Sequence, residues 1–380
     1  MTLRTLSLSS LVLLASSGMT VLAAQPSAEA DEVIARLRIQ ESPAPLSARP
    51  GWQAPKKIVL LAWGAQWNSR VAEMQAAVPS SVHVVAARNS QEALREVADA
   101  DAIVGFNPEV CDGEILGAAK QLRWLQSLSA GIELCSAGAA ARKPNLVMSN
   151  MRGVDSAAIG EHAVAMMMAL AHGLDAFAID TSKATWSRGR AGQLGLQTLE
   201  GKTLLVVGLG GIGTEVAKRG AGLGMKVIAT RQGPGTDPSY VSHVGQPDEL
   251  LKLAPTADVI ISCVPLTRET TGLYDAKFFA AMKHTAFFLN VARGGSVVTD
   301  ALVKALNERR IAGAGLDVVD PEPLPPEHPL WKAPRVLISP HISSSSDLPG
   351  NERWMLLTEN LRRYAAGGKL LQVVDIQRGY

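Results

Sequence analysis

Ten consecutive residues decide the fold: Leu204-Leu205-Val206-Val207-Gly208-Leu209-Gly210-Gly211-Ile212-Gly213. The stretch begins as a short apolar strand, turns at its first glycine and enters a helix at its last. The first glycine of the motif allows the tight turn, the second lets a pyrophosphate approach the backbone, and the third packs the helix on the strand. Because the helix N-terminus then faces the phosphates, the stretch predicts a dinucleotide site in a Rossmann-like domain.

Short apolar strands alternate with helical stretches on both sides of this loop. They occupy residues 58–62, 82–86 and 102–105 before it, and 226–230, 259–263, 286–290, 313–317 and 336–339 after it. This alternation is typical of parallel sheets covered by helices. Residues 156–171 form a long apolar helix, which we expect to join two domains or to lie in a dimer interface. Residues 351–366 form an amphipathic helix.

Composition excludes several classes of protein. A chain of 380 residues exceeds the usual size of one hydrophobic core, so two domains are expected. With 47% apolar and 19% charged residues, the composition is that of an ordinary α/β enzyme. A formal net charge of +2 and dispersed Lys and Arg argue against a nucleic-acid partner. The three cysteines lack metal-type spacing, so neither a disulfide framework nor a metal site is expected.

The N-terminal 55 residues differ from the rest. Arg4 precedes an uncharged stretch, residues 5–24, which has an apolar centre and small residues at its end, so residues 1–24 are predicted to be a signal peptide. Seven of its twenty residues are Ser or Thr, and no stable membrane span is expected. Residues 25–55 are rich in proline and are expected to form a linker with a short helix near residues 31–39. The folded part is then expected to begin near Lys56.

Three polar residues each follow a strand of the second series: Arg293, Glu322 and His341. In an open parallel sheet those strand ends border the ligand crevice. A guanidinium suits a carboxylate with an adjacent carbonyl, and a histidine held by a carboxylate can exchange the proton that accompanies a hydride. Taken singly, they could equally be a surface cation, a turn residue and a capping histidine. Together they predict a hydride-transfer site for an anionic substrate.

From about residue 58 to its end, the sequence resembles the D-isomer-specific 2-hydroxyacid dehydrogenases, in particular the glyoxylate and hydroxypyruvate reductase-like members. Besides the glycine loop, the matching stretches are Gly153-Val154-Asp155, Glu161-His162, Cys263-Val264-Pro265-Leu266-Thr267, Asn290-Val291-Ala292-Arg293-Gly294-Gly295, Gly315-Leu316-Asp317-Val318, Pro321-Glu322-Pro323 and Ser339-Pro340-His341-Ile342. The resemblance implies an NAD(P)-dependent oxidoreductase that transfers a hydride between the cofactor and a small 2-oxo or D-2-hydroxy acid.

The resemblance also implies roles for individual residues. Arg293 would bind the substrate carboxylate and keto oxygen, His341 would be the general acid or base, and Glu322 would hold and polarise His341. Asp317 would accept a hydrogen bond from the nicotinamide carboxamide. The backbone amides implied to meet the substrate carboxylate are those of Ala130 and Gly131. The other residues implied to line the cofactor are Val264, Pro265, Thr270 and Val291.

The domain layout implied by the family is an insertion. A cofactor domain, residues 152–343, would interrupt a flavodoxin-like substrate domain built from residues 56–151 and 344–380, so that the fold consists of two Rossmann-like α/β domains. Members of the family close over the substrate by hinge motion and are commonly homodimers through the cofactor domain. The apolar helix around residues 163–171 is consistent with such a dimer.

Two rival interpretations remain at this point. The corepressors called C-terminal-binding proteins resemble the same family, so a cofactor-sensing interaction protein is the alternative to an enzyme, although those corepressors are nuclear and this chain begins with an export-like segment. Formate dehydrogenases carry glutamine where Glu322 stands, which disfavours formate. Localisation also stays open: cleavage of the signal peptide predicts a periplasmic or secreted protein, whereas the scarcity of nicotinamide cofactors outside the cytoplasm favours a cytoplasmic one.

Cofactor preference depends on the end of the strand after the glycine loop. In NAD-preferring folds an acidic residue about 20 residues past that loop binds the adenosine ribose. Here the strand over residues 226–230 is followed by Arg231. A guanidinium can bind a 2′-phosphate through paired charge-assisted hydrogen bonds. We therefore expect NADP to be preferred over NAD, the alternative being a solvated arginine that tolerates either cofactor.

Overall fold

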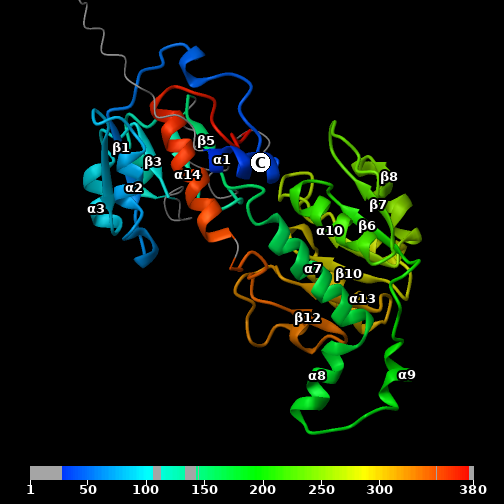
Figure 1. Ribbon diagram of the computed structural model, residues 1–380. Coiled ribbons are helices and arrows are strands. Elements are labelled where there is room, and N and C mark those ends of the chain that lie inside the picture. Colours follow the sequence, from blue (N-terminus) through cyan, green and yellow to red (C-terminus); the bar gives the residue numbers. More distant parts are fainter. Residues whose placement is uncertain (1–27, 106–112, 133–142, 144, 348, 376–380) are drawn as a thin grey trace, which may run out of the picture.

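The computed structural model describes residues 28–105, 113–132, 143, 145–347 and 349–375, and the predicted signal peptide lies outside them. Its strands form a five-stranded sheet in the order β2-β1-β3-β4-β5 and a seven-stranded sheet in the order β12-β11-β10-β9-β6-β7-β8. The two sheets lie in separate lobes (Figure 1). The first order is the flavodoxin-like one, and the second contains the classic dinucleotide-binding order. This confirms the predicted α/β fold with two Rossmann-like sheets.

The first lobe is built mainly from the N-terminal third of the chain. Its parallel strands are β1 (Lys57–Leu61), β2 (His83–Ala87), β3 (Ala102–Val104), β4 (Trp124–Gln126) and β5 (Val147–Ser149). Its helices are α2 (Val71–Ala76), α3 (Ser90–Glu96), α5 (Glu114–Ala118) and, from the C-terminus, α14 (Pro349–Ala365). The ring of Trp124 stacks on that of Tyr364 in α14, with 4.5 Å between centroids. The far C-terminal helix therefore completes the core of this lobe.

The second lobe contains the glycine loop. Its parallel strands are β6 (Thr203–Val207), β7 (Lys226–Thr230), β8 (Val241–Gly245), β9 (Val259–Ser262), β10 (Phe287–Asn290), β11 (Gly313–Leu316) and β12 (Val336–Ile338). One face is covered by α7 (Ser156–Ala171) and α10 (Gly211–Gly222), the other by α11 (Leu250–Leu253), α12 (Ala276–Ala281) and α13 (Thr299–Asn307). Both faces are therefore buried.

Short 3-10 turns connect several of these elements. They are η1 (Leu46–Ala48), η2 (Ala65–Trp67), η4 (Pro247–Glu249), η5 (Ala254–Thr256), η6 (Gly294–Ser296) and η7 (Pro329–Lys332).

Of the strands, β4, β5 and β8 were not among those expected from the sequence. Two of them have only three residues each, and β8 alternates with exposed polar residues, so none carries the apolar run that predicts a buried strand.

Helix α7 carries the chain from the first lobe into the second (Figure 1). Its side chains at Ala163, Met167 and Leu170 are completely buried against strands of the second sheet. Burial within this chain therefore explains why the helix is so apolar, and of the two expectations for it the connection between domains is the one observed. Among the described residues no single helix is long and apolar enough to cross a membrane, and α7 passes that test only together with α8 (Leu174–Ser182), at a bend of 73°.

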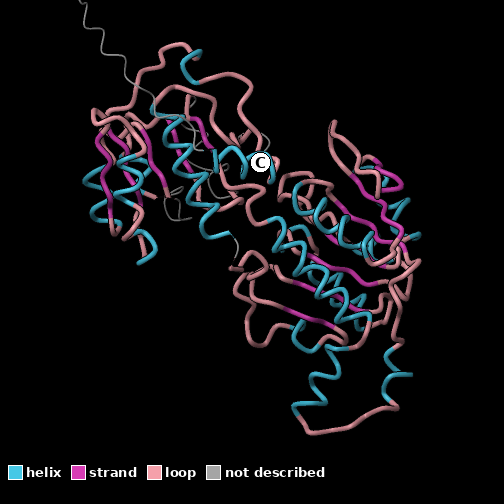
Figure 2. The backbone as a smooth tube through the Cα atoms, in the orientation of Figure 1, coloured by secondary structure: helices cyan, strands magenta, loops and turns pink. Residues whose placement is uncertain are grey.

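Helices α8 and α9 (Arg190–Leu194) form an arm that projects from the second lobe, away from both sheets (Figures 1 and 2). Arg335, just before β12, holds its base: Nε donates to Asp175 Oδ2 at 2.9 Å and Nη1 to the carbonyl of Leu194 at 2.9 Å. An ion pair between Asp180 and Arg190 joins the two helices. The arm is therefore fixed at its base and braced between its helices.

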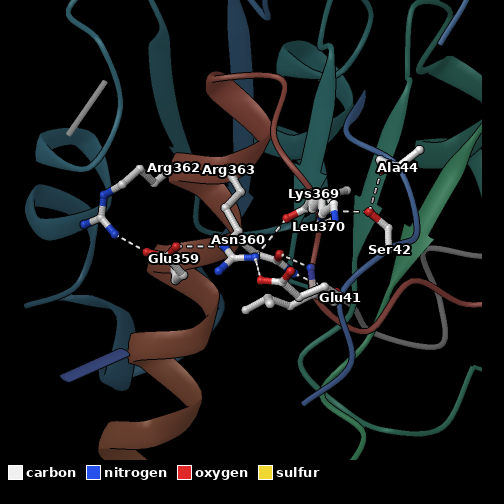
Figure 3. Close-up of polar contacts among 10 residues, drawn as sticks. Glu41, Ser42, Ala44, Glu359, Asn360, Arg362, Arg363, Lys369 and Leu370 are labelled. Carbon is white, nitrogen blue, oxygen red and sulfur yellow. Dashed lines mark hydrogen bonds and ion pairs between the residues drawn. The ribbon is translucent and has the colours of Figure 1, made fainter. Parts of the chain in front are cut away.

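Residues 25–55 were expected to form a linker with a short helix near residues 31–39. In the part that the structure describes the helix is present, but the rest packs on the first lobe. Residues 28–36 form α1, and Leu46 is buried in the core of the first lobe. Figure 3 shows the segment tied to the end of α14: the guanidinium of Arg363 bonds to Glu41 at 2.6 Å, and the amide of Leu370 donates to the Ser42 hydroxyl at 3.1 Å. The proline-rich composition suggested a linker, but backbone hydrogen bonds to residues 367–372 compensate the cost of ordering it.

Candidate active site

The predicted Arg-Glu-His set lies at the carboxyl ends of three neighbouring strands. In the sheet order β12-β11-β10, His341 follows β12, Glu322 follows β11 and Arg293 follows β10. All three strands run parallel, so their ends meet at one edge of the sheet. Ligands of open α/β sheets bind outside this edge.

His341 and Glu322 are directly bonded. Nδ1 of His341 lies 2.8 Å from Oε2 of Glu322, and the other carboxylate oxygen accepts the backbone N–H of Val319 at 3.0 Å. Because an ionised carboxylate only accepts hydrogen bonds, Nδ1 carries the proton in this pair. The side chains are 47% and 36% exposed. Nε2 of His341 bonds to none of the residues that the structure describes, which leaves it to exchange a proton with a ligand.

The backbone of His341 is held in an unusual conformation. Its φ of 52° lies in the left-handed region, which non-glycine residues rarely adopt. Its N–H donates to the carbonyl of Asp317 at 2.8 Å and to that of Ser339 at 3.0 Å. Such conformations persist only where surrounding contacts fix them, and they cluster at functional sites. The turn therefore holds the imidazole in place.

Asp317 lies underneath this turn and is almost completely buried. Its Oδ1 accepts the Ser339 hydroxyl at 2.7 Å and the amide of Ile342 at 2.9 Å, and its Oδ2 accepts the amide of Ser343 at 3.1 Å. Burial alone would raise the pKa of Asp317, but hydrogen bonds from the serine hydroxyls and the two amides hold it below its usual value. A carboxylate has about four lone-pair sites, so these donors account for nearly all of its hydrogen-bonding capacity.

His162 of α7 joins the same network. Its Nε2 lies 2.8 Å from the Ser339 hydroxyl and 3.7 Å from Asp317 Oδ1. His162 and Ser339 both lie within the sequence motifs, but the sequence predicted no role for either. They are 177 positions apart in the chain, so no local pattern could have paired them.

Arg293 sits in a tight loop after β10. The side chain of the buried Asn290 donates to the Arg293 carbonyl at 2.9 Å, and Nη1 of Arg293 donates to the Ala292 carbonyl at 2.6 Å. The next residue, Gly294, packs so closely on the β11 side that a Cβ there would lie 1.8 Å from the Val319 carbonyl oxygen. The Arg293 loop thus lies against the turn that contacts Glu322. The role of Asn290 was also missed, since only tertiary structure places its amide under the loop.

The glycine loop has the geometry that a dinucleotide requires. Gly208 has a φ of 96°, and a Cβ there would lie 2.9 Å from the Cys263 carbonyl. A Cβ at Gly213 would lie 2.1 Å from the Gly208 carbonyl, so only glycine allows this approach of helix and strand. A Cβ at Gly210 would meet nothing within 4 Å, which leaves space above the backbone. Helix α10 begins at Gly211, with Ile212 partly exposed in its first turn.

The other residues implied to line the cofactor follow β9 and β10. Pro265 is exposed, Val264 is partly buried and Val291 is buried. The Thr270 hydroxyl donates to the Pro265 carbonyl at 2.6 Å, which closes the loop after β9. Burial raises the pKa of the neighbouring Cys263 thiol to about 12, so this thiol stays neutral.

Ala130 and Gly131 follow β4, at the corresponding edge of the first sheet. Ala130 is exposed, and its carbonyl accepts the side chain of Asn150 at 2.7 Å. The amides of Ala130 and Gly131 donate to none of the described residues. Two donors from the first lobe are thus available for an anion.

Arg231 follows β7 directly, as expected, and its guanidinium contacts Asp237 at 2.7 Å.

The described residues hold no group of three or more His, Cys, Asp or Glu side chains arranged to bind a metal. A cavity of about 440 Å³ lies between α2 and α14, and none of the site residues above lines it.

Comparison with known proteins points to one family. Residues 164–343 match the family described as D-isomer specific 2-hydroxyacid dehydrogenase, NAD binding domain. The chain is 34% identical over 265 residues to a glyoxylate reductase of Thermofilum pendens, covering 67% of this chain and 76% of that one. It is 32% identical over 296 residues to a D-3-phosphoglycerate dehydrogenase of Archaeoglobus fulgidus, covering 78% of this chain but only 55% of the relative.

A solved structure agrees with these relatives. The D-isomer specific 2-hydroxyacid dehydrogenase of Xanthobacter autotrophicus Py2, in complex with NADPH and MES, superposes with a TM-score of 0.72 at 26% identity. The match covers 86% of this chain and all of the other. Both lobes are therefore shared with that protein.

The Asp317 network predicts a pH-dependent loss of stability. The pKa of Asp317 is lowered on folding, so its carboxylate stabilises the fold above its unfolded value of 3.8, and that contribution disappears as the pH falls through the folded value. We expect Asp317→Asn to lower the unfolding free energy by about 1–3 kcal/mol at pH 7, because an amide cannot accept all three bonds. The difference from wild type should shrink below about pH 4. Urea titrations at several pH values measure the unfolding free energy of wild type and variant, with the exposed Asp248→Asn as control. A difference between wild type and Asp317→Asn that stayed constant with pH would contradict this prediction.

Proposed function

The chain belongs to the D-isomer specific 2-hydroxyacid dehydrogenase family, and we propose that it transfers a hydride between NAD(P)H and a small 2-oxo or D-2-hydroxy acid of the glyoxylate or hydroxypyruvate type. The observation that carries the proposal is the His341–Glu322 pair, bonded at 2.8 Å at the carboxyl edge of a sheet that also carries the glycine loop. The similarity to glyoxylate reductases supports the substrate class.

The glycine loop would hold the dinucleotide. Its backbone approaches Cys263 and the start of α10 too closely for any side chain, while the space above Gly210 stays open for the pyrophosphate. A nicotinamide held there would supply or accept the hydride at C2 of the acid. The protein contributes binding, orientation and proton transfer.

His341 would handle the proton. With Nδ1–H directed at Glu322, Nε2 is the atom that faces a ligand, and in reduction it gives its proton to the oxygen at C2 as the hydride reaches the carbon. Glu322 would stabilise the imidazolium before transfer and fix the tautomer of the neutral imidazole that remains. In oxidation Nε2 takes the proton back from the hydroxyl.

Arg293 and the first lobe would hold the acid. A guanidinium can bond a carboxylate and the neighbouring carbonyl oxygen at once, which orients C2 for hydride transfer. The available amides of Ala130 and Gly131 would bind the same carboxylate from the other side. Closure of the two lobes would exclude water from the reacting atoms.

Arg231 would favour NADP over NAD. No carboxylate ends β7, where NAD-preferring folds carry one, and a guanidinium stands there instead. A charge-assisted contact with the 2′-phosphate stabilises NADPH relative to NADH by about 1.5–3 kcal/mol.

We also propose a homodimer through the α8–α9 arm. Trp186 at its tip is 95% exposed, and Leu174 and Ile179 of α8 are 56% and 50% exposed. Exposed large apolar side chains grouped on one projecting element are typical of a surface that is covered in an assembly. The fixed base at Arg335 would present this surface rigidly to a second copy.

The segment before α1 supports export. Its features are those of a signal peptide, and cleavage after residue 23 or 24 falls before Ala28, where α1 begins. Processing would therefore leave the described helices and strands in place.

The catalytic roles predict a graded mutant series. His341→Ala should lower turnover by about 10²–10⁴-fold and leave cofactor binding nearly intact, because only the proton donor is lost. Glu322→Gln should be milder and should move the pH optimum of reduction downward, since the imidazolium loses its anionic partner. Arg293→Lys should raise the Michaelis constant and cut turnover. Steady-state assays with glyoxylate and hydroxypyruvate test this; an unchanged rate for His341→Ala would exclude the mechanism.

The cofactor assignment predicts a higher kcat/KM with NADPH than with NADH, and a swing toward NADH in Arg231→Asp, because an introduced carboxylate repels the 2′-phosphate. Measuring both cofactors with wild type and variant decides it. Equal or better wild-type performance with NADH would show that Arg231 is only a surface charge.

The dimer predicts a mass change on mutating the arm. Ile179→Lys combined with Trp186→Lys should convert a dimer into a monomer of intact fold, since two charges would be buried without partners. Light scattering after size exclusion measures this, with the similarly exposed Leu251→Lys outside the arm as control. A monomeric wild type would contradict the proposal.

Export predicts a mature chain that begins near Ala24 or Gln25 in a periplasmic fraction. N-terminal sequencing of the protein from fractionated cells tests it. Finding Met1 intact in the cytosol would be the contrary result.

A further inference from the structure

The guanidinium of Arg231 is held inside its own loop. Its Nη2 donates to the Gly235 carbonyl at 2.9 Å and to Asp237 Oδ1 at 2.7 Å, and its Nε lies 3.4 Å from the Gly233 carbonyl. The side chain of Arg231 is 18% exposed, whereas that of Asp237 is 55% exposed. The arginine expected to meet a 2′-phosphate thus already has an anionic partner.

The ion pair with Asp237 occupies a hydrogen-bond donor of Arg231 that a phosphate would need. A guanidinium has five N–H groups: one on Nε and two on each terminal nitrogen. Both N–H groups of Nη2 are used by Gly235 and Asp237, and Nε points toward Gly233. Within the described residues only Nη1 has both donors available. A paired contact with a phosphate requires two nitrogens, so it cannot form while Asp237 holds Nη2.

We propose that Asp237 competes with the cofactor's 2′-phosphate for Arg231 and thereby limits the discrimination between NADPH and NADH. The inference rests on the proposed function, in which Arg231 binds that phosphate. A bound NADPH must break the Arg231–Asp237 ion pair to gain the second hydrogen bond, and it also meets the repulsion of a nearby carboxylate. NADH meets neither cost.

Asp237 could instead help NADPH by orienting Arg231, but Gly235 makes this the smaller effect. A Cβ at Gly235 would lie 2.7 Å from Cζ and 2.9 Å from Nη1 of Arg231, so the guanidinium lies directly against the backbone there. That contact and the Gly235 carbonyl bond do not depend on Asp237. Orientation therefore survives removal of the carboxylate, whereas competition and repulsion do not.

Binding measurements on the full chain separate these effects. Asp237→Asn removes the charge and keeps an acceptor, and Asp237→Ala also frees one N–H of Nη2, while the other stays on the Gly235 carbonyl. We expect dissociation constants for NADPH and for adenosine 2′,5′-bisphosphate to fall by roughly 5–10-fold in Asp237→Ala and by less in Asp237→Asn, while those for NADH and 5′-AMP stay within about twofold. Isothermal titration calorimetry gives these constants without turnover. Asp248→Asn removes an exposed charge elsewhere in the same lobe and should change none of them.

A third variant tests the position of the guanidinium. Gly235→Ala places a Cβ where the guanidinium lies and should weaken NADPH binding selectively. If the Asp237 variants bind the 2′-phosphate ligands with unchanged or lower affinity, the inference is overturned and Asp237 is neutral or a positioning residue. Failure of the wild type to bind either dinucleotide would contradict the proposed function itself and this inference with it.

Discussion

A buried carboxylate organises the turn that carries His341. Asp317 lies beneath β12, and its side-chain oxygens accept hydrogen bonds from three donors in residues 339–343. Its backbone carbonyl accepts the amide of His341. Burying a charge is costly unless every lone pair facing the protein is used, so the sequence around β12 must supply those donors. Through the Ser339 hydroxyl the same carboxylate reaches His162 of α7. One charge thus joins two neighbouring strands and the helix that connects the lobes, and the imidazole is positioned as a result.

Most of the second lobe could be predicted from sequence because its elements have local signals. The strand that enters the glycine loop is a continuous apolar run, and its glycines have steric causes within the same few residues. The first lobe was harder. Strands β4 and β5 have three residues each and gain their stability from neighbours, and the segment over residues 28–52 is ordered by a C-terminal stretch more than 300 residues away. No window of sequence contains both partners of such a contact.

The candidate site likewise contains residues that the sequence predicts and residues that it does not. Arg293, Glu322 and His341 could be found because each follows a strand whose end must lie at the ligand edge, and the structure brings Glu322 and His341 into contact. Their supporting residues could not. From sequence, Asn290 is only the end of a strand and Ser339 only part of a turn. In the folded chain the Asn290 amide bonds to the Arg293 carbonyl, and the Ser339 hydroxyl bonds to Asp317. Arg231 was placed correctly at the end of β7, but its bond to Asp237 depends on a loop conformation that sequence does not specify.

The anchoring of the α8–α9 arm has a mechanical consequence. Arg335, which grips the arm, immediately precedes β12, and His341 follows the same strand at its other end. A strand of three residues is only about 10 Å long and its backbone hardly stretches. Because β12 is paired with β11 along its length, one short strand holds the anchor of the arm and the turn that presents the imidazole at a fixed separation.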